Sequence, residues 1–147
     1  MKQSISYYLP PILWAAFIFL ASSNSDPLFF LSKEGVQFLK HTRFLGQSLL
    51  NLTWAMSHVF IYAVLAFLFV RALAYHRHFT LRLFWITFAV TLLYGVSDEI
   101  HQVFVPGRGF QLYDILMDGV GALLGLGVYA LHNFKRAQKL REQALML

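Results

Sequence analysis

The residues with the clearest chemical potential lie in two short acidic motifs. Ser97-Asp98-Glu99-Ile100-His101-Gln102 is followed, after Pro106-Gly107-Arg108, by Asp114-Ile115-Leu116-Met117-Asp118. The motifs hold four of the seven acidic residues in this 147-residue chain, and both border strongly apolar segments. An ionisable side chain at or inside a membrane boundary is costly unless it is paired, hydrated or enclosed by protein. We therefore interpret the two motifs as one functional site, in which carboxyl groups could act as general acid and base.

Helical spacing gives the first motif one polar face. Asp98 and Gln102 are one turn apart, separated by about 40° around a helix, with Glu99 near 100°. The helix is expected to continue to Phe104, because the residue before Pro106 is disfavoured in α geometry. This face could instead be a wet surface outside the membrane.

The second motif shares its helical stripe with two glycines. Asp114 and Asp118 lie within about 40° of each other, and Gly121 and Gly125 fall on the same side. Small residues four apart let helices approach closely in lipid, so we expect this stripe to face the bundle interior. Asp114 could alternatively cap the helix or interact with its dipole. Asp118 needs a partner, for which Arg108 and His58 are the candidates.

His58 and Tyr62 form a further candidate pair, one turn apart in an apolar segment at the expected depth of the acidic motifs. His58 or His101 could act as general acid or base, although a lone histidine beside an aromatic is often a core residue. Arg108 suits a phosphate or carboxylate. The candidate catalytic residues are Glu99, Asp98, Asp118 and His58, and the candidate substrate-binding residues are Arg108, Gln102, Asp114 and Tyr62.

The composition indicates a membrane protein. Hydrophobic residues make up 58% of the chain, charged residues only 13%, and the mean hydropathy is +0.57. There are no cysteines, which excludes disulfides and thiolate metal sites. A net charge of +5 spread over loops and a tail does not predict nucleic-acid binding.

Four segments are apolar enough to cross a bilayer, and they predict an all-α bundle forming a single domain over residues 1–147. The expected spans are roughly residues 7–21, 53–73, 81–97 and 113–131, of which the first is shorter than the usual length of about 20 residues. A signal peptide is the alternative for this first segment. Oligomeric state cannot be inferred.

Lys and Arg are unevenly distributed between the two ends of such a bundle. Eight of the twelve fall at the amino end, in the 71–82 connection and in the basic tail 134–147. The positive-inside rule then places both termini in the cytoplasm and the acidic motifs near the outer face. The tail could be a short amphipathic helix on the inner membrane surface or a solvated segment. Residues 35–50 could form an interfacial helix that caps the site.

The motifs also resemble a known family. His58 and Tyr62, the run from Ser97 to Arg108, Asp114 to Asp118, and Gly121 to Gly125 together resemble the VanZ-like membrane proteins. The resemblance implies a small four-helix protein of the bacterial inner membrane, and the family's namesake is tied to resistance to the glycopeptide teicoplanin. Members commonly have Asn where this chain has Asp118, which adds a carboxylate.

Three functions are compatible with these residues. The first is an enzyme or binding protein for a lipid-linked or glycopeptide envelope molecule at the outer leaflet. The second is a structural or envelope-stress protein in which Arg108 and the carboxylates form an ion-pair network. The third is a small proton-coupled carrier. No cofactor is required; a divalent cation such as Mg²⁺, Mn²⁺ or Zn²⁺ is compatible, but no ligand spacing is diagnostic.

Overall fold

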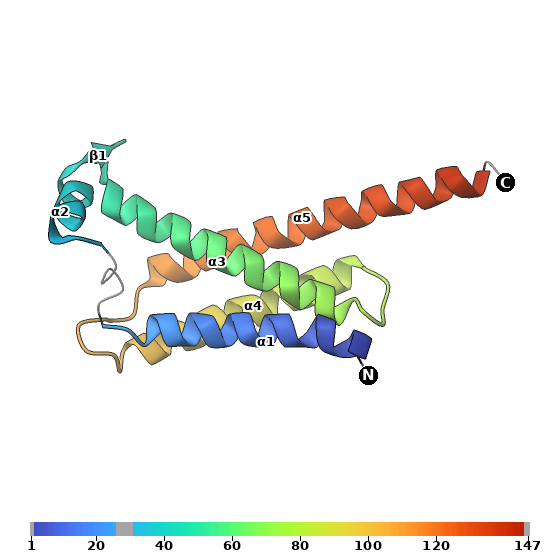
Figure 1. Cartoon of the computed structure of the whole chain (residues 1–147), viewed down its shortest axis with the longest axis horizontal. Helices are drawn as coiled ribbons and strands as arrows, with labels where there is room; N and C mark the ends of the chain where they lie inside the picture. Colours follow the sequence, from blue (N-terminus) through green and yellow to red (C-terminus); the bar gives the residue numbers. More distant parts are fainter. Residues whose placement is uncertain (1, 26–30, 146–147) are drawn as a thin grey trace.

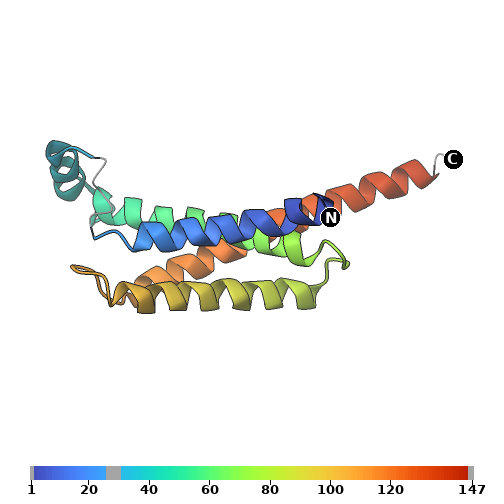
Figure 2. The same cartoon turned by 60° about the horizontal axis from the view of Figure 1, so that its bottom comes forward.

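Four long helices dominate the computed structural model, which describes residues 2–25 and 31–145 (Figure 1). They are α1 (Lys2–Ser22), α3 (Leu49–Leu73), α4 (Leu81–Gln102) and α5 (Leu112–Leu145). All four are long and apolar enough to cross a membrane. The predicted all-α bundle with four candidate spans is therefore confirmed, and both termini lie toward the same end of it (Figures 1 and 2).

Helices α3 and α4 are longer than the apolar spans predicted for them: α3 starts before residue 53, and α4 ends after residue 97. Ser48 caps α3 by accepting a hydrogen bond from the Asn51 amide, so that the helix begins at Leu49, four residues before the predicted start. Thr80 caps α4 through the Leu83 amide, and this helix ends at Gln102 rather than Phe104. Hydropathy marks the part of a helix that suits lipid, whereas hydrogen-bonding caps decide where the backbone becomes helical.

Helix α1 is longer than predicted, and Pro10 and Pro11 lie inside it rather than near its start. Membrane helices tolerate such prolines where neighbours compensate the freed backbone groups. Side-chain bonds tie α1 to the middle of the bundle: the Trp14 indole donates to the Ile61 carbonyl at 2.9 Å, and the Tyr94 hydroxyl donates to the Ala15 carbonyl at 2.6 Å. These bonds favour a packed span over a removable signal peptide.

The connection between α1 and α3 differs from the predicted interfacial helix over 35–50. It contains the shorter helix α2 (Lys33–His41) and a hairpin of β1 (Arg43–Phe44) and β2 (Gln47–Ser48). Leu45 and Gly46 have φ of 50° and 81°, as a tight two-residue hairpin turn requires. No residue of α2 is buried, and Phe44 and Leu45 of the hairpin are exposed.

Helix α5 continues without a break through the basic tail, for which a short surface helix and a solvated segment were the two predicted alternatives. Its 34 residues span about 51 Å, well beyond a hydrocarbon core of about 30 Å. Figures 1 and 2 show the carboxyl-terminal turns projecting past the other helices. A continuous helix is consistent with the sequence, since no Gly or Pro follows Gly127.

The closest approach in the bundle is between α3 and α5, which cross in Figure 1. A Cβ atom on Gly121 would overlap the Val59 carbonyl, and one on Gly125 would overlap the Ala63 carbonyl. The predicted small-residue stripe thus faces the interior. Beyond it, Ala66, Val70, Ala122 and Leu126 form a fully buried apolar cluster between the same helices.

Candidate functional site

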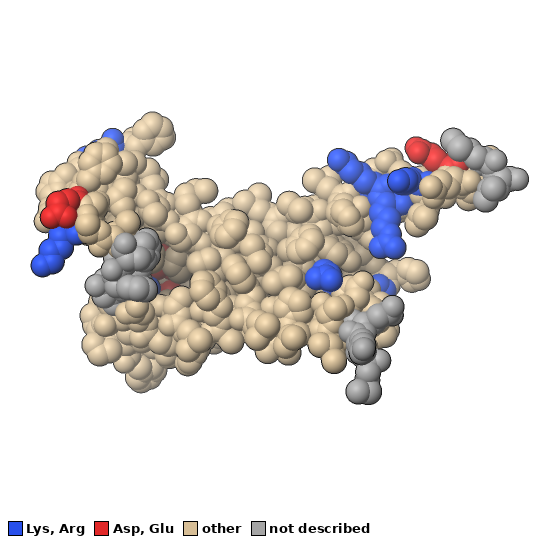
Figure 3. Space-filling view, in the orientation of Figure 1, with Lys and Arg blue, Asp and Glu red and all other residues tan. Residues whose placement is uncertain are grey.

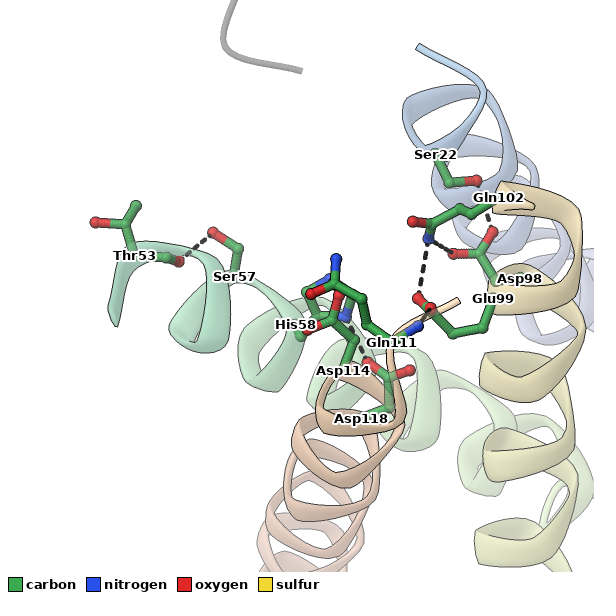
Figure 4. Close-up of polar contacts among 10 residues, drawn as sticks. All are labelled: Ser22, Thr53, Ser57, His58, Asp98, Glu99, Gln102, Gln111, Asp114 and Asp118. Carbon is green, nitrogen blue, oxygen red and sulfur yellow. Dashed lines mark hydrogen bonds and ion pairs between the residues drawn. The ribbon is translucent and has the colours of Figure 1, made fainter. Parts of the chain in front are cut away.

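The two acidic motifs meet near one end of the bundle, where α1, α3, α4 and α5 converge (Figure 4). Asp98, Glu99, Asp114 and Asp118 are all buried, with exposed fractions of 6%, 1%, 7% and 1%. Burial excludes the alternative that this face is wet surface. Buried carboxyl groups must find partners, and here they do so in two connected groups.

The first group joins α4 to α1 and to the start of α5. The Gln102 carboxamide donates to both Asp98 and Glu99, each at 3.1 Å. Asp98 also accepts a 2.6 Å bond from the Ser22 hydroxyl, and Glu99 accepts a 2.8 Å bond from the Gln111 amide. Neutral donors thus hold both carboxyls, and the amide nitrogen of Gln102 must face them because its oxygen would be repelled.

The second group centres on His58 of α3. Its Nδ1 lies 2.8 Å from one oxygen of Asp118, and its Nε2 lies 3.6 Å from Asp114. The imidazole therefore sits between two carboxyls one helical turn apart. An ionised carboxylate only accepts hydrogen bonds, so Asp118 fixes the tautomer with the proton on Nδ1 and directs Nε2 toward Asp114.

A small niche at Gly95 accommodates the deepest carboxyl. A Cβ atom there would lie 2.7 Å from Asp118 Oδ2 and 3.3 Å from the Tyr62 ring. Both Asp118 Oδ2 and the Tyr62 hydroxyl are buried and have no hydrogen-bond partner among the described residues. Tyr62 also lies parallel to His58, with ring centroids 6.4 Å apart. Gly95 therefore provides the space that the second oxygen of Asp118 occupies.

Two cavities open beside this cluster, and Figure 3 shows acidic atoms within a hollow at this end of the molecule. The outer cavity, of about 650 Å³, is lined by polar residues including Gln47, Asn51 and Asp114. The inner cavity, of about 460 Å³, is lined largely by apolar residues and reaches His58, Tyr62, Asp98 and Gln102. Both volumes are in the range of small-molecule sites.

Arg108 lies beside both cavities. It was one of the two predicted partners of Asp118, but Asp118 pairs with the other one, His58. Its guanidinium is 5.7 Å from the centre of the Trp54 ring, and both residues line both cavities. In the part of the chain that the structure describes, no carboxylate lies within ion-pair distance of Arg108, and the ion pairs of the acidic cluster come from His58. The predicted network of Arg108 with several carboxylates is therefore wrong.

His101 is the other candidate that the structure separates from the cluster. Its ring stacks on Phe19 of α1, with centroids 4.4 Å apart. The site gains instead Ser22, Trp54, Gly95 and the Gln111 amide, which the sequence analysis did not identify. Only Gly95, within an apolar helix three residues before Asp98, carried a local signal.

The cluster is not arranged as a metal centre. Within residues 2–25 and 31–145, no three His, Asp or Glu side chains converge in a way that could hold a metal ion. The two His58 contacts and the Gln102 carboxamide engage one oxygen of each of the four buried carboxyls. A divalent cation thus has no geometric support from these residues.

These features define a small polytopic membrane protein with a buried acid–base cluster that connects to two cavities. A family comparison is more specific: residues 7–133 match the VanZ/LLP1 family model, so the chain belongs to the VanZ/LLP1 family. The match covers most of the chain, extending the resemblance noted from His58 to Gly125. No curated protein and no solved structure gives a significant match.

Proposed function

We propose that this protein performs acid–base chemistry on an anionic, lipid-linked envelope molecule at the outer leaflet of the bacterial inner membrane. The observation that carries the proposal is the position of His58 between Asp118 and Asp114, beside two cavities. VanZ/LLP1 membership supports a membrane protein. A contribution to teicoplanin resistance is the cellular role that the family's namesake suggests.

His58 is suited to be the general base. With Nδ1 donating to Asp118, Nε2 is free to take a proton from a water or a substrate hydroxyl. The imidazolium that forms then faces Asp114 at 3.6 Å, so its charge is stabilised as it develops. A carboxylate that orients a histidine in this way also keeps the ring from rotating away from the reacting atom.

Arg108 is suited to hold the anionic group of the substrate. Its guanidinium is half-buried, packs on Trp54 and has no carboxylate partner in the described structure. A half-buried guanidinium that no described carboxylate neutralises favours binding of phosphate or carboxylate through charge-assisted hydrogen bonds. The anion would lie near the His58–Asp114 contact, because Arg108 lines the same two cavities as these residues.

The test is to measure phenotype and membrane abundance together for His58→Gln and Asp118→Asn. Glycopeptide susceptibility and envelope lipid composition are scored against the parent and a strain lacking the gene. We expect His58→Gln to lose the phenotype at near-parental abundance, because loss of a general base typically slows a reaction by about 10²–10⁴-fold. Asp118→Asn, which introduces the residue common in the family, should weaken the phenotype less, because its carboxamide oxygen still accepts from His58 Nδ1. His132→Gln, on an exposed face of α5, is the matched control.

The alternative structural role predicts a different pattern. If the cluster only holds the helices together, abundance and the thermal midpoint in detergent fall in parallel with the phenotype. If both variants keep the phenotype at normal abundance, His58 has no acid–base role and the proposal fails.

A further inference from the structure

The two cavities differ in the chemistry of their walls, and they meet at a shared boundary. Carboxamides of Gln47 and Asn51, together with Tyr113, contribute to the outer cavity. Ile18, Leu39 and Ile61 contribute to the inner cavity, which reaches between α1 and α3. One site therefore offers hydrogen-bonding groups on one side and hydrocarbon on the other.

The boundary between the cavities carries the charged groups. Trp54 and Arg108 line both spaces, while His58 lines the inner cavity and Asp114 the outer one, with 3.6 Å between His58 Nε2 and Asp114 Oδ2. A ligand that occupied both cavities would thus pass its connecting group beside Arg108 and the His58–Asp114 contact. An anionic connecting group matches the Arg108 guanidinium, which has no carboxylate partner among the described residues.

The outer cavity indicates the type of head group. Carboxamides both donate and accept hydrogen bonds, the Trp54 ring offers a flat apolar face, and Asp114 accepts. Such a wall suits a neutral group rich in hydroxyls better than a second charge. The inner cavity suits an unbranched or isoprenoid chain, because its apolar residues lie on helices that border the bilayer.

From these walls we infer that the ligand is a saccharide joined through a phosphate to a hydrocarbon chain. The saccharide occupies the outer cavity, the phosphate lies on Arg108, and the chain occupies the inner cavity between α1 and α3. The inference rests on the proposed function, which it makes more specific by naming the substrate class and the bond that faces His58.

Native mass spectrometry of the full chain, released from detergent micelles, tests this inference with four probes. They are dodecyl phosphoglucose, dodecyl phosphate, dodecyl glucoside and glucose 1-phosphate, which contain all three parts or lack one. We expect 1:1 binding of dodecyl phosphoglucose, at least about tenfold tighter than any probe lacking a part, because each such probe loses sugar hydrogen bonds, a charge-assisted contact or buried hydrocarbon.

Three variants test where the saccharide, the hydrocarbon chain and the phosphate bind. Asn51→Trp should remove the advantage of the sugar while dodecyl phosphate still binds, and Ala21→Trp should weaken every probe that carries a chain. Arg108→Gln should make dodecyl phosphoglucose bind no better than dodecyl glucoside. Leu93→Trp, on an exposed face of α4, is the control and should leave all affinities unchanged.

Equal binding of dodecyl phosphate and dodecyl phosphoglucose, with no effect of Asn51→Trp, would refute the saccharide. Binding that is indifferent to Ala21→Trp would refute the chain site, and an absence of binding by every probe would overturn the whole inference. These results are independent of the proposed chemistry. If His58→Gln still abolishes the cellular phenotype at normal abundance, the acid–base proposal stands without this substrate.

Discussion

The four buried carboxyls fall into two pairs, and only one pair contacts His58. Asp98 and Glu99 are held by a hydroxyl, a carboxamide and a backbone amide, all neutral donors. Asp114 and Asp118 instead face an imidazole, which is able to gain and lose a proton. The cluster therefore separates into a half held by neutral donors and a half built around an imidazole, and the second half is the one for which we propose acid–base chemistry.

Gly95→Ala tests whether the position of Asp118 matters as much as its charge. The new methyl group would lie 2.7 Å from Asp118 Oδ2, closer than carbon and oxygen can approach, so the carboxyl must move from His58. We expect the phenotype to fall at least about tenfold, because misplacing a catalytic group by 1 Å can cost about 10²-fold. Activity and membrane abundance of this variant are the measurements.

Gly119→Ala is the matched control for Gly95→Ala, since its Cβ would lie at an ordinary 3.6 Å from Leu92. Normal activity in both variants would show that Asp118 has freedom to move, and that its bond to His58 is not required.

Gln102→Leu tests the half of the cluster held by neutral donors. Leucine has a similar size but donates no hydrogen bonds, so Asp98 and Glu99 each lose one donor while remaining buried. We expect the free energy of unfolding in detergent to fall by about 1–3 kcal/mol for each carboxyl that loses a hydrogen-bond donor. Gln138→Leu, at an exposed position of α5, should leave the unfolding free energy unchanged within about 0.5 kcal/mol. Equal stability of the two variants would contradict the bridging role of Gln102.

At the scale of the elements, the apolar stretches correctly predicted four helices, while their ends depended on features that hydropathy does not measure. Ser48 and Thr80 start helices through side-chain caps, and the absence of a helix breaker carries α5 to Leu145. Of the segment 35–50, which was expected to form one helix, only the part up to His41 is helical. The Leu45-Gly46 turn, with positive φ at both residues, closes a hairpin instead.

Gly121→Ala and Gly125→Ala test the contact between α3 and α5. Each added methyl group would overlap a backbone carbonyl, of Val59 or Ala63, and backbone cannot move aside without separating the helices. We expect each variant to lower the unfolding free energy by about 1–3 kcal/mol, as overpacking does in well-packed cores. Stability against denaturation in detergent provides the measurement.

Gly127→Ala provides the reference for these two substitutions, because nothing lies within 4 Å of its Cβ position. Alanine favours helix over glycine by about 0.5–1 kcal/mol, so this variant should be unchanged or slightly more stable. A loss of stability equal to that of Gly121→Ala would show that the close approach is not the cause.

For the molecule as a whole, contacts between site residues on the same helix could be predicted from the sequence, whereas contacts between residues on different helices could not. Asp98 with Gln102, and Asp114 with Asp118, follow from helical spacing alone. His58 was recognised as one of two possible partners of Asp118, but the choice between it and Arg108 required the crossing of α3 and α5. Ser22 and Trp54 gave no local signal, since a serine at a helix end and an aromatic in a membrane protein are both common.

The orientation in the membrane is the last prediction, and the proposed substrate depends on it. Both termini and the 71–82 connection lie at one end of the bundle, with eight of the twelve basic residues, and the site lies near the other end (Figures 1 and 3). The positive-inside rule then places the termini in the cytoplasm. A fluorescent protein fused after Leu147 should fluoresce, while alkaline phosphatase there should be inactive and phosphatase inserted after Gly109 should be active. The reverse pattern would open both cavities toward the cytoplasm. The acid–base geometry would be unchanged, but the substrate would then have to be a molecule of the inner leaflet rather than of the outer one.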